Sequence, residues 1–224
     1  MKRYDTYLFD GDGTLFDTAD LVVHCFQYVA EKHCGISVSR EAILSGYGLP
    51  LKGQLVKQLG EDADIETIIQ DFIDYQVQII DEDVSLFPGV WETLAELKQT
   101  GSKLAVVTSR KPFSLGRILK NTDIAQFFDT LVTPDDTTLH KPNPEPALLA
   151  LSRLERKPSE AVFVGDSQYD ILSGNRAGTD TVFVNWSHLG IETVPIEPTW
   201  MIDEMTDLVR TSGSQEKENS LGNG

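Results

Sequence analysis

Four short and almost entirely apolar runs recur along this chain, and they limit its fold more than any other feature. They span residues 4–9, 103–107, 161–164 and 181–184. A strand that is buried on both faces has such a continuous apolar run, so these segments predict a parallel sheet that is covered on both sides. Helical patterns at 88–99, 111–121, 144–154 and 168–177 alternate with the runs. This order predicts an α/β fold with a doubly wound, Rossmann-like sheet.

Residues 18–85 interrupt the alternation of strands and helices. Amphipathic helical patterns at 21–32, 51–59 and 65–80 follow one another there without a convincing strand between them. We therefore expect a small α-helical cap at 18–85, inserted into a catalytic core of residues 1–17 and 86–211. Residues 212–224 contain one aliphatic side chain in thirteen and are expected to form a disordered tail.

The charge and the cysteines restrict the partners of the protein. The 224 residues carry a formal net charge of −16, which disfavours binding to nucleic acid or to an anionic membrane. No apolar run approaches the roughly 20 residues of a membrane span. Cys25 and Cys34 match no zinc pattern. We expect a reduced, cytoplasmic monomer or homodimer that binds a small molecule.

Two carboxylates, Asp10 and Asp12, lie one residue apart where the first apolar run ends, in the segment LFDGDGTLFD. In an open parallel sheet, functional groups gather beyond the carboxyl ends of the strands. The later runs deliver further polar groups to that edge, namely Thr108, Ser109, Lys141, Asp166 and Asp170. Asp170 follows Asp166 by one helical turn, so both carboxylates can face the same edge.

Four acids at one edge repel one another unless a cation lies between them. Mg²⁺ accepts oxygen ligands and would offset this charge. A phosphate could then bridge the metal to Lys141 and Thr108, with added donors from the backbone N–H groups of the Gly11–Thr14 turn. Glycines in that turn allow the backbone to approach a ligand closely.

Each of these features also has a simpler interpretation. The first acid pair could begin a calcium loop, but Leu15 and Leu21 stand where that loop has Gly and Glu. A metal-binding DxD of a nucleotide-sugar transferase would leave the later lysine and acids unexplained. Asp166 and Asp170 alone could stabilise a helix start, and Lys141 alone could be a surface lysine. Only their combination favours a catalytic site.

With these residues in this order, the chain resembles the haloacid dehalogenase superfamily, in its phosphatase branch with a helical cap. Four motifs are present: DGDGT at 10–14 for the usual DxDGT, Thr108 after an apolar strand, Lys141 in KPNPEP, and GDSQYD at 165–170. The resemblance covers about residues 1–210. Four motifs with this spacing are far more specific than one motif alone.

The resemblance implies phosphoryl transfer in two steps. Asp10 would attack phosphorus to form an aspartyl-phosphate, and Asp12 would protonate the leaving oxygen and later activate water. Mg²⁺ would be bound by Asp10, the carbonyl oxygen of Asp12, Asp166 and, close by, Asp170. The phosphate-binding residues would be Gly13, Thr14, Thr108, Ser109 and Lys141.

Two positions depart from the usual pattern of the family. Gly11 replaces a bulky apolar residue, which predicts a looser loop and a less firmly packed Asp10. Ser109 and Arg110 replace a common Asn-Lys pair, which predicts altered contacts to substrate. In the cap, Tyr47 and Lys52 of the turn SGYGLPLK are candidates for substrate selection. This turn resembles the specificity loop of phosphoglycolate phosphatases and related pyrophosphatases, and GLPL is closer to the latter.

We therefore expect a Mg²⁺-dependent phosphatase that hydrolyses a small phosphorylated metabolite similar to phosphoglycolate, pyrophosphate or a sugar phosphate. One alternative is a phosphomutase resembling β-phosphoglucomutase, in which the phosphoryl group passes to a second sugar hydroxyl instead of water. Another is a catalytically silent binding protein on the same fold, which only Gly11 would suggest.

Overall fold

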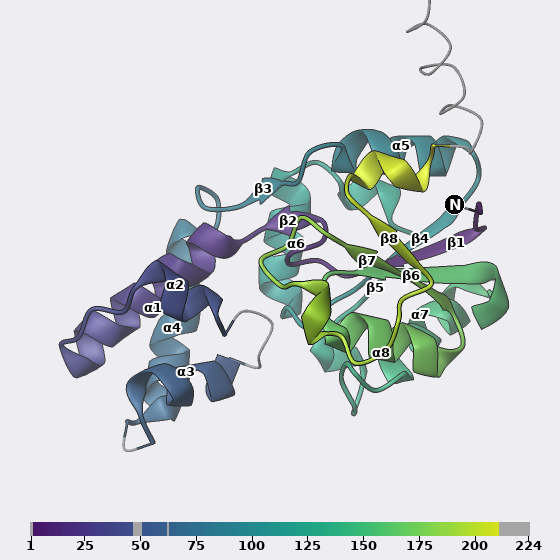
Figure 1. The fold of residues 1–224 in the computed structure, drawn as a ribbon. Coiled ribbons are helices and arrows are strands. Elements are labelled where there is room, and N and C mark those ends of the chain that lie inside the picture. The colour runs from purple at the N-terminus through teal and green to yellow at the C-terminus, as the bar shows by residue number, and fades with distance from the viewer. Residues whose placement is uncertain (1, 47–50, 62, 211–224) are drawn as a thin grey trace, which may run out of the picture.

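A six-stranded parallel sheet forms the centre of the computed structural model, which describes residues 2–46, 51–61 and 63–210 (Figure 1). The strand order is β5-β4-β1-β6-β7-β8. In chain order the strands are β1 (Thr6–Phe9), β4 (Lys103–Val107), β5 (Thr130–Val132), β6 (Ala161–Gly165), β7 (Asp180–Val184) and β8 (Trp200–Ile202). The first strand, β1, lies in the middle of the sheet, and the later strands extend the sheet on both sides of it. This strand order confirms the predicted doubly wound α/β fold.

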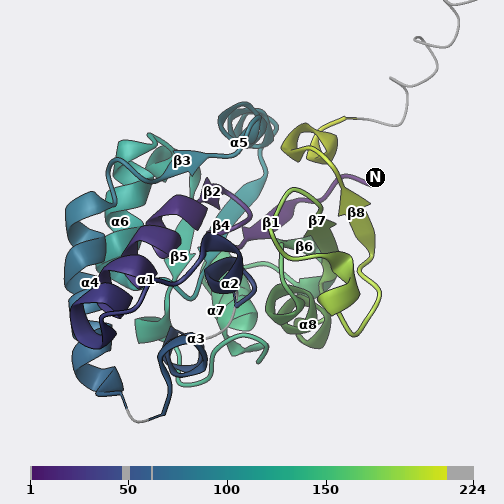
Figure 2. The same cartoon turned by 60° about the vertical axis from the view of Figure 1, so that its left-hand side comes forward.

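Both faces of the sheet are buried because its strands carry apolar side chains on each side. Tyr7 and Phe9 pack on the face covered by α5 (Val90–Gln99) and α6 (Pro112–Asn121). Leu8 packs on the opposite face, under the helices α7 (Glu145–Leu154) and α8 (Gln168–Ala177). Figure 2 shows these two helix layers on either side of the sheet.

The helix and strand boundaries agree closely with those expected from the sequence, with a few differences. Helix α5 begins at Val90 instead of residue 88, because Gly89 before it has φ +77° and lies in the left-handed region. The strands β5 and β8 lie at the two edges of the sheet. Each has three residues, which is too short for a recognisable apolar run.

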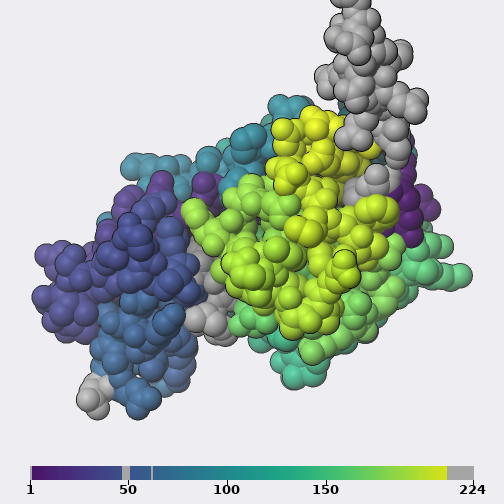
Figure 3. Space-filling model, viewed as in Figure 1, coloured from purple at the N-terminus to yellow at the C-terminus, as the bar shows by residue number. Residues whose placement is uncertain are grey.

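The first four helices of the chain lie together beside the sheet. They are α1 (Ala19–Cys34), α2 (Arg40–Leu44), α3 (Leu51–Leu59) and α4 (Ile65–Ile79). Aromatic pairs join α1 to α4, with the rings of Tyr28 and Tyr75 stacked at 4.0 Å. The segment protrudes from one side of the molecule (Figure 3). Helix α2 was not predicted, since five residues show no amphipathic period.

The chain enters and leaves the helical segment through two paired strands. These are β2 (Phe16–Asp17) and β3 (Ser85–Leu86), which run antiparallel. The division into core and cap at residues 17 and 86 stays a prediction, and the expected tail at 212–224 lies outside the described residues. Within the described ranges, none of the helices combines the length and apolar character needed to cross a bilayer.

Candidate active site

The carboxyl ends of β1, β4 and β6 meet at one edge of the sheet, and each carries a buried polar residue there. Asp10 follows β1, Thr108 follows β4 and Asp166 follows β6. The backbone N–H of Asp10 donates to the carbonyl of Val164 at 2.9 Å, which fixes the residue against the neighbouring strand. The parallel sheet thus brings together residues that are far apart in the sequence.

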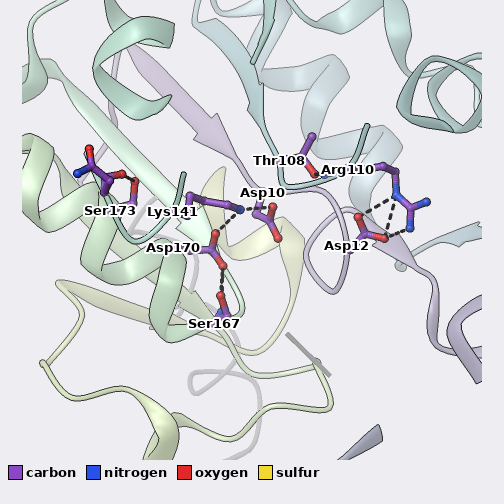
Figure 4. A network of polar contacts seen from close by, with 9 residues as sticks. Asp10, Asp12, Thr108, Arg110, Lys141, Ser167, Asp170 and Ser173 are labelled. Atoms are coloured by element: carbon purple, nitrogen blue, oxygen red, sulfur yellow. Dashed lines mark hydrogen bonds and ion pairs between the residues drawn. The ribbon is translucent and has the colours of Figure 1, made fainter. Parts of the chain in front are cut away.

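Lys141 joins two of the acids in a buried ion-paired cluster (Figure 4). Its Nζ donates to Asp10 at 2.5 Å and to Asp170 at 2.7 Å. The side chains of Lys141, Asp10 and Asp170 are 6%, 9% and 0% exposed. Asp170 also accepts hydrogen bonds from the backbone N–H and hydroxyl of Ser167, at 3.1 and 2.6 Å. It therefore caps α8 and faces the site at the same time.

Asp10, Asp166 and Asp170 have carboxylate oxygens within 4.8 Å of one another. Burial, together with the nearby Asp170, raises the pKa of Asp10 to about 7. Burial and the same neighbour raise the pKa of Asp166 well above its usual range. Burial alone would lower the pKa of Lys141, but Asp10 and Asp170 outweigh it and raise that pKa. Three carboxyl groups facing one ammonium leave an excess of negative charge, so this oxygen donor set fits a hard divalent cation.

Glycine is required at two positions for these acids to lie so close together. Gly13 has φ +81°, and a Cβ there would lie 2.1 Å from Oδ2 of Asp166. A Cβ at Gly165 would lie 2.2 Å from Cβ of Asp170. A larger residue at position 13 would push the first and fourth motifs apart, and one at position 165 would displace Asp170 within the fourth motif.

Asp12 points away from this cluster and toward Arg110 (Figure 4). The Nε of Arg110 donates to both carboxylate oxygens of Asp12, at 3.2 and 2.9 Å, and its Nη2 also contacts Oδ1. The hydroxyl of Thr18 donates to Oδ1 as well, at 2.8 Å. Burial alone would raise the pKa of Asp12, but the Arg110 guanidinium outweighs it and holds that pKa below its usual value.

The other predicted phosphate-binding residues lie in two segments, with Gly13 and Thr14 in the turn after β1 and Thr108 and Ser109 directly after β4. The Oγ1 of Thr108 accepts a hydrogen bond from the backbone N–H of Arg110 at 3.1 Å, whereas Ser109 is exposed. The backbone N–H groups of Gly13 and Thr14 donate within the turn, to the carbonyls of Phe16 and Gly11. Among the described residues, no group forms a hydrogen bond with the buried Thr14 hydroxyl.

The two predicted specificity residues belong to the segment that precedes and begins α3. Tyr47 lies outside the described residues. Lys52 is exposed on α3. Among the contacts of the described residues, none joins Lys52 to the acid cluster.

Gly11 is packed more firmly than the sequence predicts. It is buried, and its carbonyl accepts hydrogen bonds from Leu15 and Phe16 at 2.8 and 3.0 Å. A Cβ at this position would lie 3.0 Å from Cε2 of Phe16 and 3.3 Å from Oγ1 of Thr108. The Phe16 ring therefore adjoins the space that a side chain would enter, and the expected loosening of the loop is not observed.

The sequence did not indicate the groups that hold the acids in place. Ser187, in the loop after β7, donates to Oδ2 of Asp166 at 2.5 Å. Arg110 and Thr18 hold Asp12. The sequence marks Arg110, two residues after Thr108, as a departure that alters contacts to substrate, but it does not predict the pairing with Asp12. Ser187 and Thr18 had no comparable signal, because hydroxyl residues are common in loops.

This fold and this cluster of acids and lysine define an enzyme that acts on phosphate esters. Residues 7–184 match the haloacid dehalogenase-like hydrolase family. The chain therefore belongs to that family. Within it, the chain is a phosphatase, a hydrolase of phosphate esters.

The similarity to individual proteins covers nearly the whole chain. Pyrophosphatase PpaX of Bacillus velezensis is 39% identical over 213 residues, which are 95% of this chain and 98% of that protein. Pyrophosphatase PpaX of Bacillus anthracis is 35% identical over 210 residues, 92% and 95% of the two chains. A crystal structure from Bacteroides fragilis, described as a haloacid dehalogenase-like hydrolase, has a TM-score of 0.83 and 30% identity, covering 92% of this chain and 100% of that one.

Proposed function

We propose that this protein is a Mg²⁺-dependent phosphatase that hydrolyses inorganic pyrophosphate, with Asp10 as its nucleophile. One observation carries the proposal: the buried Asp10 carboxylate lies 2.5 Å from the Lys141 ammonium and within a cluster with Asp166 and Asp170. The choice of pyrophosphate is supported by the pyrophosphatases that resemble this chain over more than nine-tenths of its length.

The residues of the chain divide the work of phosphoryl transfer. A carboxylate oxygen of Asp10 attacks phosphorus and forms an aspartyl-phosphate, which water then hydrolyses. Lys141 and Thr108 hold the transferring oxygens, and Asp12 activates the attacking water. Asp10, Asp166 and Asp170 would hold Mg²⁺, which when bound neutralises charge on the phosphoryl group.

The helical segment at 18–85 acts as the cap in this proposal, closing over the acid cluster to exclude water until the intermediate has formed. Its turn with Tyr47 and Lys52 would select the leaving group. The variants Tyr47→Phe and Lys52→Ala are expected to change the relative kcat/KM values across a phosphoester panel. Unchanged ratios would show that another part of the cap selects the substrate.

The first experiment is a phosphate-release assay with pyrophosphate, phosphoglycolate, a sugar phosphate and para-nitrophenyl phosphate, with and without Mg²⁺. We expect Mg²⁺-dependent turnover with the highest kcat/KM for pyrophosphate, and no turnover in Asp10→Asn. Asp135→Asn is the matched control, because that carboxylate is 54% exposed and pairs with Lys111.

The other outcomes discriminate between the alternatives. Preference for phosphoglycolate or a sugar phosphate would overturn the substrate but keep the phosphatase mechanism. Transfer of the phosphoryl group to a second sugar hydroxyl would indicate a mutase. No turnover of any phosphoester by the wild type, despite Mg²⁺ binding, would favour a silent binding protein.

A further inference from the structure

Arg110 is a nearly buried cation that lies between the second acid of the first motif and the helical segment. Its side chain is 8% exposed. One side of the guanidinium contacts Asp12, and its Nη1 donates to Oε1 of Gln76 on α4 at 3.3 Å. The guanidinium is thus held from the core and from the helical segment together.

The reaction geometry places the leaving group near this cation. In phosphoryl transfer, the attacking and leaving oxygens lie roughly in line on opposite sides of phosphorus. In the proposed mechanism Asp12 activates water on the side of phosphorus opposite to Asp10, and its carboxylate points away from the Lys141 cluster (Figure 4). A group that leaves toward Asp12 therefore comes within reach of the guanidinium that grips Asp12.

The charge of the leaving group determines whether a guanidinium beside Asp12 can stabilise it. Pyrophosphate releases a multiply charged phosphate, whereas an alkyl ester releases an alcohol and para-nitrophenyl phosphate releases a nitrophenolate with one delocalised charge. A guanidinium attracts phosphate oxygens through its positive charge and its N–H donors. The acids at this edge and the net charge of −16 repel a polyanion, so a local cation has a large effect on its binding.

We propose that Arg110 is a specificity-determining residue that binds the departing phosphate of a diphosphate, with Gln76 orienting its guanidinium. This inference rests on the proposed function. Pyrophosphate enters as its singly protonated trianion, an Asp10 oxygen bonds to phosphorus, and the bridging P–O bond breaks. The bridging oxygen keeps the electron pair and leaves as hydrogenphosphate, so atoms and charge balance without an added proton.

The test compares kcat and KM of Arg110→Gln for pyrophosphate and for para-nitrophenyl phosphate. We expect kcat/KM for pyrophosphate to fall at least about tenfold further than kcat/KM for the aryl ester. Both reactions lose the contact that holds Asp12, but only pyrophosphate also loses charge-assisted contacts to its leaving phosphate. Arg110→Lys keeps the charge without the planar fork and should recover part of the loss.

Arg117→Gln is the matched control. Arg117 also reaches from the core to the helical segment, donating to the carbonyl of Val77 and to Asp81, both at 2.5 Å, but it does not contact Asp12 in the described structure. Arg117→Gln should change kcat/KM for pyrophosphate and for para-nitrophenyl phosphate by the same factor.

A binding measurement separates the effect of Arg110 on pyrophosphate binding from its effect on catalysis. In an Asp10→Asn background with Mg²⁺, calorimetry should show that Arg110→Gln weakens pyrophosphate binding at least tenfold and orthophosphate binding little. Equal losses for both substrates in an otherwise active enzyme would overturn this inference alone. A wild type that hydrolyses para-nitrophenyl phosphate but not pyrophosphate would overturn it together with the proposed substrate.

Discussion

Lys141 balances the charge of the acids around it, so the residue matters for stability as well as for chemistry. Its ammonium is paired with two carboxylates and is almost fully removed from water. Breaking such a buried pair leaves uncompensated charge, which costs far more than losing an exposed pair. Lys111 provides the contrast, since it pairs with Asp135 while 67% of its side chain is exposed.

We expect Lys141→Met to abolish phosphatase activity and, without divalent ions at pH 7, to lower the free energy of unfolding by about 2–3 kcal/mol. Protonation of Asp10, whose pKa burial raises, offsets part of the cost. Lys111→Met should cost less than about 0.5 kcal/mol. Urea denaturation of both variants checks this, and equal stabilities would contradict the assignment of a buried charge pair.

Asp129 gives a pH-dependent prediction away from the site. Burial alone would raise its pKa, but hydrogen bonds from Lys98, the Leu104 backbone N–H and Lys103 lower it to about 2. Because the pKa is lower in the folded state, this stabilisation is complete above about pH 4 and is lost as the pH falls toward 2. Asp129→Asn should therefore destabilise the protein by about 1 kcal/mol at pH 7, allowing for the partial exposure of the pair.

The difference in unfolding free energy between wild type and Asp129→Asn should shrink between pH 4 and pH 2. Asp135→Asn removes the same charge from an exposed pair and controls for the net charge. A difference that stays constant down to pH 2 would show that the carboxylate charge is not the cause.

The sequence predicts where a functional residue lies when the course of the backbone alone determines its location. Asp10, Thr108 and Asp166 end buried parallel strands, so their proximity follows from the fold. The pairing of Arg110 with Asp12 does not follow, because the partners are 98 residues apart and meet through side-chain packing. The firm packing of Gly11 was also not predictable, since it depends on where the Phe16 ring lies.

At the scale of single elements, α8 shows that glycine in a helix can be required by packing. Gly174 lies inside α8, and a Cβ there would lie 2.7 Å from Cβ of Phe163 and 2.9 Å from Cγ2 of Thr181. The helix therefore lies directly on β6 and β7. Gly116 in α6 is the counterpart, because a Cβ there would meet nothing within 4 Å.

We expect Gly174→Ala to destabilise the protein by about 1–3 kcal/mol through overpacking. Gly116→Ala should instead stabilise it by about 0.5–1 kcal/mol, since alanine has the higher helix propensity. Thermal and urea denaturation of the two variants measure this contrast. Stabilisation by both substitutions would mean that α8 can move away from the sheet at little cost.

Periodicity predicts elements with enough residues to show a pattern. The buried strand β4 and the helices α3 and α8 have the predicted bounds. The five-residue helix α2 and the two-residue strands β2 and β3 were not predicted, because their formation depends on neighbours that are distant in the sequence.

For the whole molecule, the balance of charge links folding to the proposed metal. The net charge of −16 includes three carboxyl groups gathered in one buried cluster. A cation bound there stabilises the native state by mass action, because the unfolded chain has no such cluster. Screening by any salt would also relieve repulsion among surface charges, so the two effects must be separated.

We expect Mg²⁺ at about ten times its dissociation constant to raise the Tm by about 3–5 °C relative to EDTA, since this corresponds to roughly 1.4 kcal/mol in a protein of this size. NaCl at the same ionic strength should raise it by less. Asp166→Asn should remove most of the difference between the two salts, whereas Asp135→Asn should preserve it, because Asp135 is exposed and pairs with Lys111. Equal rises with both salts in the wild type would attribute the stabilisation to screening of the net charge and not to a bound ion.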